Sequence, residues 1–232
     1  MNYQNHGQYV SMAQGFMQKV YAWMFAGLSI SALVSYYLLS HEALLNKIMM
    51  NFWGVIGLMV VMFALIGYLS TQFTKMSYAA VVFCYGLFAF AEGILFAPLL
   101  YQYTGSSVVN IFVVTALMFL AMAVYGTITK ADLSSMGNIL FMGLWGLIIS
   151  GLVNMFLQNS VFGMLISAFG VGVFSMMIAY DVQMLRRLSQ QAMMQPQEIN
   201  KYAVMGALNL YLNMINLFLY LLRLFGEEKR NR

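Results

Sequence analysis

Two acidic residues stand inside long apolar stretches of the chain and are the first candidates for chemistry. Glu92 occurs in "FAFAEGILFAPLL", and Asp181 occurs in "MMIAYDVQMLRR". A charged side chain in membrane hydrocarbon costs at least about 2.5–3.5 kcal/mol on insertion scales, so it is rarely kept without a reason. Glu92 is therefore either a protonated or hydrogen-bonded structural carboxyl, or a gate or relay carboxylate that lines a cavity.

Asp181 stands where an apolar run of about twenty residues ends, five residues before Arg186 and Arg187. One interpretation is an interfacial aspartate that ends the span. The other is a helix that continues past Asp181 and keeps the carboxyl among apolar groups. In that case its neighbours at helical spacing are Met177, Ile178, Met184 and Leu185.

Polar side chains recur at helical spacing in the last apolar stretch, "ALNLYLNMINLFLYLLRLFG" (207–226). They occupy positions i, i+4, i+7, i+11 and i+14, which lie on one face of a helix. These residues are Asn209, Asn213, Asn216, Tyr220 and Arg223. In lipid such a polar stripe must face other helices or water. It is either structural hydrogen bonding between helices or the lining of a polar cavity.

The composition places these residues in a membrane protein. Of the 232 residues, 62% are hydrophobic and only 8% are charged, against roughly 25% charged in soluble domains. A single cysteine, Cys84, excludes an intramolecular disulfide. The net charge of +4 is modest, and no basic patch alternates with exposed aromatic residues, so nucleic-acid binding is not indicated.

Charged and polar connectors divide the chain into seven apolar segments that are long enough to span a bilayer. Because lipid offers the backbone no hydrogen-bond partners, these segments are predicted to be helices. We expect a polar N-terminal tail over 1–19, one transmembrane domain over 20–224 and a charged tail over 225–232. The predicted spans are Val20–Ser40, Phe52–Ser70, Ser77–Leu100, Val108–Ile128, Ile139–Phe156, Val161–Tyr180 and Tyr202–Leu224.

The distribution of Lys and Arg favours a cytoplasmic N-terminus, because cytoplasmic loops carry an excess of these residues. With that orientation the inner loops hold Lys19, Lys75, Lys130, Arg186, Arg187 and Lys201. The outer side holds Lys47 together with the basic C-terminal residues Arg223, Lys229, Arg230 and Arg232. The C-terminal tail thus disagrees with the loops. An even number of spans, with a re-entrant last helix, would remove the disagreement.

Small residues recur four apart in the fifth and sixth predicted spans. The pairs are Gly146/Ser150, Gly163/Ser167 and Ala168/Gly172. Such spacing lets helix backbones approach closely in a membrane, so these pairs predict tight helix contacts.

Several of these segments resemble the Bax inhibitor-1 family of membrane proteins. The resemblance rests on "AYDVQML" (179–185) and on "ALNLYLNMINLFLYLLRLFG" (207–226), with support from "FAEGILFAPL" and "KVYAWMFAGLSISALVSYYL". It covers nearly the whole chain. It implies an all-α fold of seven transmembrane helices with the C-terminal helix central in the bundle. Family members are described as pH-sensitive calcium leak channels or as regulators of cell death and stress, and some bacterial members as modulators of a membrane-bound AAA protease.

The resemblance also implies a pair of sensing aspartates, one in each of the last two helices. Asp181 matches the first, but Asn213 stands where the family pattern has the second, "LYLNMINLF" in place of "LYLDFINLF". Two close carboxylates share a proton, whereas an Asp–Asn pair has one titrating group. The resemblance therefore implies a proton switch that is weaker or moved to lower pH, and a calcium site at Asp181 and Asn213 with one charge fewer. Arg186 and Arg187 are the nearby basic residues that could act at a gate.

Two functional hypotheses follow for a protein of a bacterial inner membrane. The first is a pH-modulated calcium or cation leak, gated around Asp181 and the polar face of the last span. The second is a non-conducting interaction protein that modulates a membrane-bound protease or a stress response. The candidate ion-pathway or pH-sensing residues are Asp181, Asn213, Glu92, Asn209, Asn216 and Arg223.

An intramembrane enzyme is disfavoured. His6 and His41 lie outside the predicted spans, so the spans hold no His/Glu metal set and no Ser/His pair for nucleophilic catalysis. No resident cofactor is expected, with calcium only as a transient ligand. The expected partners are the lipid bilayer, calcium ions and another membrane protein such as an AAA protease, with no nucleic acid.

Overall fold

The chain is helical along nearly all of its described length. The computed structural model describes residues 3–192 and 198–229, with the side chains of 14–189 and 198–229. Within these residues the elements are α1 (Tyr3–Leu39), α2 (Glu42–Met50), α3 (Phe52–Gln72), α4 (Tyr78–Tyr101), α5 (Gly105–Ile128), the short 3₁₀ helix η1 (Leu133–Met136), α6 (Gly137–Leu157), α7 (Ser160–Ala192) and α8 (Ile199–Phe225). The prediction of an all-α polytopic membrane protein is confirmed.

Polar side chains in the connectors cap the N-termini of two helices. The side chain of Asn51 accepts from the Gly54 N–H at the start of α3, and Ser77 accepts from the Ala80 N–H at the start of α4. Each bond satisfies a donor that the first turn of a helix leaves unpaired. At the end of α6, Gln158 takes a left-handed conformation with φ of 50°, which turns the chain into α7.

Seven helices in the described part of the chain are long and apolar enough to cross a membrane. Their positions agree with the predicted spans within several residues, except at the end of the sixth span, and the structure differs from the prediction in two further features. The connector after the first span contains the unpredicted helix α2, whose Leu45 packs on Leu38 and Ala97. In addition, α1 begins at Tyr3, so helix runs through the segment expected as a polar tail. Residues 230–232 of the expected C-terminal tail lie outside the described residues.

The predicted end of the sixth span at Tyr180 is wrong, because α7 continues to Ala192. Val182, Gln183 and Leu185 are buried after that point. A helix that ended at Tyr180 would leave these groups without their packing. Asp181 is therefore not an interfacial residue that ends a helix but lies inside one.

The residues divide into two compact units, where the sequence suggested one domain over 20–224. Unit 1 contains residues 1–102 and 188–211, and unit 2 contains residues 103–187 and 212–232. Both α7 and α8 contribute to both units. The last span is the most buried of those described: 67% of its most apolar stretch is buried, against 39% or less in each of the others. Such burial is expected of a helix that other helices surround.

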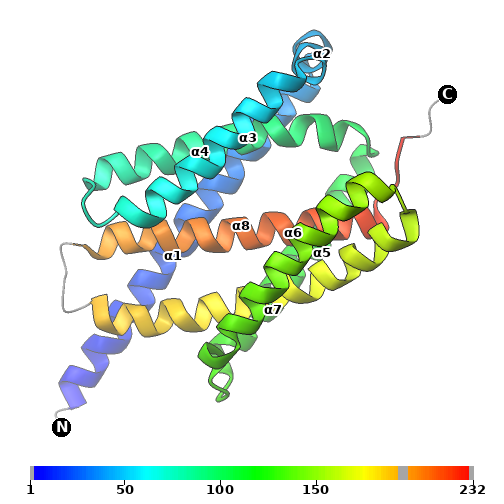
Figure 1. The fold of residues 1–232 in the computed structure, drawn as a ribbon. Helices are drawn as coiled ribbons and strands as arrows, with labels where there is room; N and C mark the ends of the chain where they lie inside the picture. The colour runs from blue at the N-terminus through cyan, green and yellow to red at the C-terminus, as the bar shows by residue number, and fades with distance from the viewer. Residues whose placement is uncertain (1–2, 193–197, 230–232) are drawn as a thin grey trace. The chain divides into compact units, whose positions relative to one another are not determined.

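In unit 1, α1 packs along α4 (Figure 1). The hydroxyls of Ser31 and Ser35 donate to the backbone carbonyls of Ala89 and Gly93, each at 2.8 Å. Gly93 permits this approach, since a Cβ there would lie 2.7 Å from the Ser31 carbonyl oxygen. Small residues at the contact and hydroxyl-to-carbonyl bonds across it are the usual means by which helices associate in lipid.

At one end of unit 1, three segments that the span count places on the same side of the membrane are bonded together. The Lys201 ammonium, at the start of α8, donates to the carbonyls of Thr74 and Met76 in the α3–α4 connector, at 3.0 and 3.2 Å. Lys19 donates to the Asn200 side chain at 2.9 Å. Lys201 also forms an ion pair with Glu198 at 2.7 Å, so the positive charge of the buried ammonium is balanced by a carboxylate.

At the other end of the last span, in unit 2, the C-terminal residues pair with the α4–α5 connector. The Thr104 N–H donates to the Glu227 carbonyl at 2.9 Å, and Tyr103 forms an isolated antiparallel bridge with Glu228. The alternative of a re-entrant last helix is therefore wrong. Because α8 is continuous from Ile199 to Phe225, residues 226–229 follow its C-terminal end and lie beside the α4–α5 connector. Arg230 and Arg232 lie outside the described residues.

The tight helix contacts are only in part where the small-residue pairs predicted them, since a Cβ at Gly163 of α7 would lie 3.0 Å from the side-chain nitrogen of Asn154 on α6. Among the described residues, no atom lies within 4 Å of a Cβ built at Gly146 or at Gly172. The close approach in unit 2 is at Gly126 of α5, where a Cβ would lie 2.9 Å from the Cα of Ala179 in α7. Glycine spacing within one helix does not show which glycine faces a neighbour.

Candidate functional site

Asp181 and Asn213 form a direct pair in unit 2. The Asn213 side-chain amide donates to Asp181 Oδ2 at 2.6 Å. Asn213 is only 5% exposed, and the α7 residues Ile178, Ala179 and Val182 around the carboxylate are fully buried. Helix α5 also packs closely against this part of α7, at the contact between Gly126 and Ala179. The two residues that the sequence singled out on separate helices are therefore brought into contact.

The pair offers oxygen atoms to a cation. Asp181 keeps Oδ1 and the second lone pair of Oδ2, and the Asn213 carbonyl oxygen remains as an acceptor. Carboxylate and amide oxygens are the ligands that hard cations such as calcium prefer. Two protein residues supply only part of the six to eight oxygens that calcium takes, so an ion passing here would keep much of its water. That coordination suits passage better than tight storage.

The other residues of the polar stripe on α8 have different surroundings. Asn216 donates to the Leu212 carbonyl of its own helix at 2.8 Å. Tyr220 stacks on Phe174 of α7 with ring centroids 5.7 Å apart, and the Arg223 guanidinium lies 5.9 Å from the centre of the Tyr220 ring. Asn209 is exposed and belongs to unit 1, and Arg223 is exposed in unit 2. Among the stripe residues, Asn213 alone bonds an acidic side chain in the described contacts.

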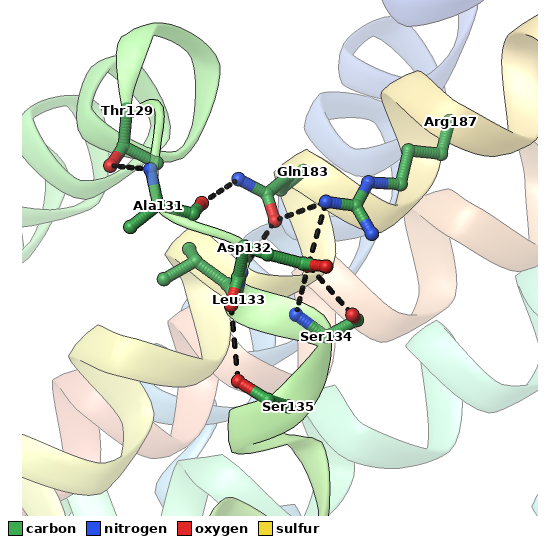
Figure 2. Close-up of polar contacts among 8 residues, drawn as sticks. All are labelled: Thr129, Ala131, Asp132, Leu133, Ser134, Ser135, Gln183 and Arg187. Atoms are coloured by element: carbon green, nitrogen blue, oxygen red, sulfur yellow. Dashed lines mark hydrogen bonds and ion pairs between the residues drawn. The ribbon is translucent and has the colours of Figure 1, made fainter.

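Gln183, two residues after Asp181, clamps the α5–α6 connector onto α7 (Figure 2). Its carbonyl oxygen accepts from the Leu133 N–H at 2.8 Å, and its amide donates to the Ala131 carbonyl at 2.9 Å. One side chain thus forms hydrogen bonds with two backbone groups of the connector. Sequence reasoning missed this role, and the available signal was a glutamine inside an apolar helix, only 9% exposed in the structure.

Arg187 and Arg186 extend the same clamp. Arg187 pairs with Asp132 at 2.7 Å and donates to the Gln183 carbonyl oxygen at 3.2 Å (Figure 2). Arg186 donates to the Thr127 carbonyl near the end of α5. Of the two arginines that the sequence proposed for a gate, Arg187 thus bonds the connector that joins α5 to α6 and Arg186 bonds the last turn of α5. Because Asp181 also lies on α7, these arginines could affect it only by changing the position of that helix.

Asp132 is a permanently charged member of the clamp at neutral pH. Hydrogen bonds from the Ser134 hydroxyl and N–H, with the Arg187 guanidinium, lower its pKa from the usual 3.8 to about 2. A carboxyl with a lowered pKa in the folded state stabilises that state above its ordinary pKa and loses this effect as pH falls towards 2. The clamp therefore does not respond to pH in the neutral range.

Replacing Gln183 by leucine should loosen the connector. The substitution keeps the side chain's bulk but leaves the Leu133 N–H and the Ala131 carbonyl without their partner. An unsatisfied buried polar group costs about 1–3 kcal/mol, so we expect a clear fall in the thermal midpoint of the detergent-solubilised protein. Gln102→Leu, at an exposed glutamine, makes the same chemical change and should leave the midpoint nearly unchanged. Equal midpoints for the two variants would contradict the clamp.

Comparisons with known proteins show the family to which this chain belongs. The family model described as "Inhibitor of apoptosis-promoting Bax1" matches residues 13–231. The inner membrane protein YbhL of Escherichia coli K12 is 38% identical over 217 residues, which cover 93% of each chain. An uncharacterized protein of Borreliella burgdorferi is 36% identical over 97% of each chain. The uncharacterized protein YrjE of Lactococcus lactis is 35% identical over 94% of this chain and 92% of its own.

The match of the family model extends from the first span to the C-terminal tail, and the similar inner membrane protein is aligned over nearly the full length of both chains. The structure adds the spans that such a protein requires and the pairing of the two polar positions in the sixth and seventh spans. This chain is therefore an integral membrane protein and belongs to the Bax inhibitor-1 family.

Proposed function

We propose that the protein is a passive cation leak of a bacterial inner membrane, with calcium as a substrate and the Asp181–Asn213 pair on its path. The observation that supports this most is the 2.6 Å bond between Asn213 and Asp181. It places a carboxylate and an amide oxygen within two membrane spans, where polar groups are costly unless they serve packing or transport. The activity is transport and not catalysis.

The proposed path is gated by movement of α7. Asp181 lies on α7. The same helix carries Gln183 and Arg187, which bond the α5–α6 connector, and Arg186, which bonds the last turn of α5. A shift of α7 that separates Asp181 from Asn213 would have to strain or break these bonds. The clamp therefore favours the paired arrangement, which we assign to the closed state.

We also propose that the N-terminus is cytoplasmic. Within unit 1, Lys19, the α3–α4 connector and the start of α8 are bonded at one end. This end carries Lys19, Lys75 and Lys201. An even number of spans separates these residues from Lys130, Arg186 and Arg187, so all six lie on the same side of the membrane in the proposed topology. The positive-inside rule assigns such a side to the cytoplasm.

The test is calcium uptake into liposomes that contain the purified full-length protein, compared between the natural chain and Asp181→Asn. Hydrogen bonds to charged groups contribute about 1.5–3 kcal/mol. Losing the charge that holds Asn213 and attracts the cation should therefore change uptake by roughly tenfold or more. Glu42→Gln, an exposed carboxylate changed to its amide on α2, is the matched control and should behave like the natural chain.

Two outcomes would overturn the proposal. Uptake by the natural chain no greater than in empty liposomes would exclude the leak. Equal uptake by Asp181→Asn at every pH would remove Asp181 from the path. In the first case the second hypothesis, a non-conducting protein that modulates another membrane protein such as a protease, becomes the interpretation to pursue by crosslinking in native membranes.

A further inference from the structure

Helix α2 of unit 1 is held at a boundary of the membrane by its place in the chain. It joins α1 and α3, which both belong to spans, and it has nine residues. A helix of that length rises about 14 Å and cannot cross a hydrocarbon layer of about 30 Å. Its connectors are residues 40–41 and residue 51, so each of them extends over at most about 11 Å. Helix α2 therefore stays next to the end of α1 and the start of α3 (Figure 1).

One face of α2 is covered by other helices of unit 1. Leu45 is 1% exposed and packs on Leu38 and Ala97, and Ile48 is partly buried against the same cluster. Leu38 is the residue before the last of α1, and Ala97 lies in the last turns of α4. This face thus fixes α2 against the ends of two spans, at the level where hydrocarbon gives way to lipid headgroups.

The apolar surface of α2 is wider than the part that the other helices cover. Residues four apart lie next to each other on a helix, so Met49 lies beside Leu45 and Leu44 lies beside Ile48. Leu44 and Met49 are nonetheless 43% and 44% exposed. They form an exposed apolar margin on the two sides of the buried face. Such a margin next to a polar face is typical of helices that lie in the plane of the membrane boundary.

Exposed aromatic side chains continue this margin into the neighbouring turns of the spans. Phe52 and Trp53, in the first turn of α3, are 65% and 78% exposed, and their rings meet edge to face with centroids 5.7 Å apart. Tyr36 and Tyr37, in the last turn of α1, are exposed as well. Trp and Tyr gather where hydrocarbon meets headgroups, because each combines an apolar ring with a polar group.

The opposite face of α2 carries an ammonium group without a carboxylate partner. Ala43 and Lys47 are each two residues from Leu45, which places them on the far side of the helix, and both are exposed. Among the residues that the structure describes, no ion pair includes Lys47. A lysine side chain is long enough to reach the headgroup layer, where the phosphates of anionic lipids are the available anions.

We propose that α2 and the first turn of α3 form a binding surface for anionic phospholipid. Leu44, Met49 and Trp53 enter the boundary between acyl chains and headgroups, and Lys47 pairs with the lipid phosphate. Lipid is the occupant because the same surface continues into the membrane. Val60, seven residues after Trp53 and on the same face of α3, lies inside a span and is 61% exposed. The surface stands whether or not the protein conducts cations.

The experiment locates single tryptophans on α2 in liposomes that contain the full-length protein. The three natural tryptophans are replaced by phenylalanine, and Leu44→Trp is compared with Ala43→Trp, its neighbour on the polar face. Bromine atoms on lipid acyl chains quench a tryptophan that touches lipid, whereas iodide in the buffer quenches one that faces water. We expect Leu44→Trp to lose most of its emission to brominated lipid and little to iodide. Ala43→Trp should show the reverse.

The role of Lys47 is tested in mixtures in which phosphatidylglycerol is brominated and phosphatidylcholine is not. A lysine at the membrane surface favours anionic lipid by about fivefold, so quenching of Leu44→Trp should exceed the share of brominated lipid in the mixture. Leu44→Trp/Lys47→Gln should return the quenching to that share. Leu44→Trp/Lys75→Gln, at an exposed lysine of the α3–α4 connector, is the matched control and should keep the excess.

Strong quenching of Leu44→Trp by iodide overturns the proposal, because α2 then faces water. Quenching by neither agent overturns it as well, since another protein or a second copy of this chain then covers the margin. An excess that survives Lys47→Gln overturns the assignment of an anionic lipid to this lysine. If Leu44→Trp does not fold, Met49→Trp on the other margin takes its place with the same expectations. No flux is measured, so these results are independent of the leak.

Discussion

The Asn213→Asp variant is expected to show a pH-dependent change in calcium uptake that is steeper than in the natural chain. In the structure the Asn213 amide nitrogen lies 2.6 Å from Asp181 Oδ2. Two carboxylates at this separation cannot both ionise readily, so the pair holds one proton between them and titrates as a unit. Protons and calcium then compete for the same oxygens, and uptake should fall as the solution is made more acidic.

The measurement is calcium uptake into liposomes between about pH 5 and about pH 8, the range in which such switches operate. The expected difference across this range is roughly tenfold for Asn213→Asp, as for a change of about 1.4 kcal/mol, and clearly smaller for the natural chain. Asn216→Asp is the matched control. It introduces the same carboxyl three residues further along α8, at a side chain that bonds the Leu212 carbonyl and not Asp181.

Either of two results would contradict the assignment of Asn213 as the partner that limits proton sensing. One is an equally steep pH dependence in Asn213→Asp and in the natural chain. The other is an identical gain in Asn216→Asp, which would show that any added carboxyl on this face of α8 has the effect.

Gly126→Val is expected to cause the largest loss of stability among single substitutions of the glycines discussed above. A Cβ at Gly126 would lie 2.9 Å from the Cα and 3.0 Å from the carbonyl carbon of Ala179. These are backbone atoms of α7 and cannot rotate away, so α5 and α7 must separate. Overpacking costs about 1–3 kcal/mol, and we expect the upper end of this range. The thermal midpoint should fall by roughly 10 °C.

The control is Gly146→Val on α6, where the described surroundings leave open space around the Cβ position. It makes the same change in helix propensity and should leave the midpoint almost unaltered. Gly126→Val should also disturb uptake, because Ala179 is two residues from Asp181 on α7. Equal midpoints for the two variants would mean that α5 and α7 do not touch at Gly126 in the membrane.

The amino-acid sequence alone was sufficient to predict the number of spans and their approximate positions. Lipid satisfies no backbone hydrogen bond, so each long apolar segment must be helical whatever its neighbours are. For that reason the ends of α3 and α4 agree with the prediction within about two residues, a difference of the usual size at helix ends. The two positions Asp181 and Asn213 were also recognised in advance, through the motifs that carry them. Their 2.6 Å contact then followed the expectation for that pair of helices.

Other features depended on the tertiary structure because their causes are far apart in the chain. The sixth span was predicted to end at Tyr180, since polar residues follow it. The helix continues because Gln183 and Arg187 bond a connector that lies about fifty residues earlier. A polar side chain can satisfy itself with water or with a distant backbone group, and its residue type does not distinguish the two.

The same reason applies to the close helix contacts and to the surroundings of Glu92. The glycine spacing on α6 and α7 was visible, but the glycine at which one helix of unit 2 meets the backbone of another is Gly126 on α5. Likewise Glu92 was recognisable as a carboxyl within a span, whereas the contacts of its turn of α4 involve Ser31 and Tyr211, which are 180 residues apart in the chain. Hydrophobicity acts residue by residue along the sequence, and contact partners are decided only when the helices pack.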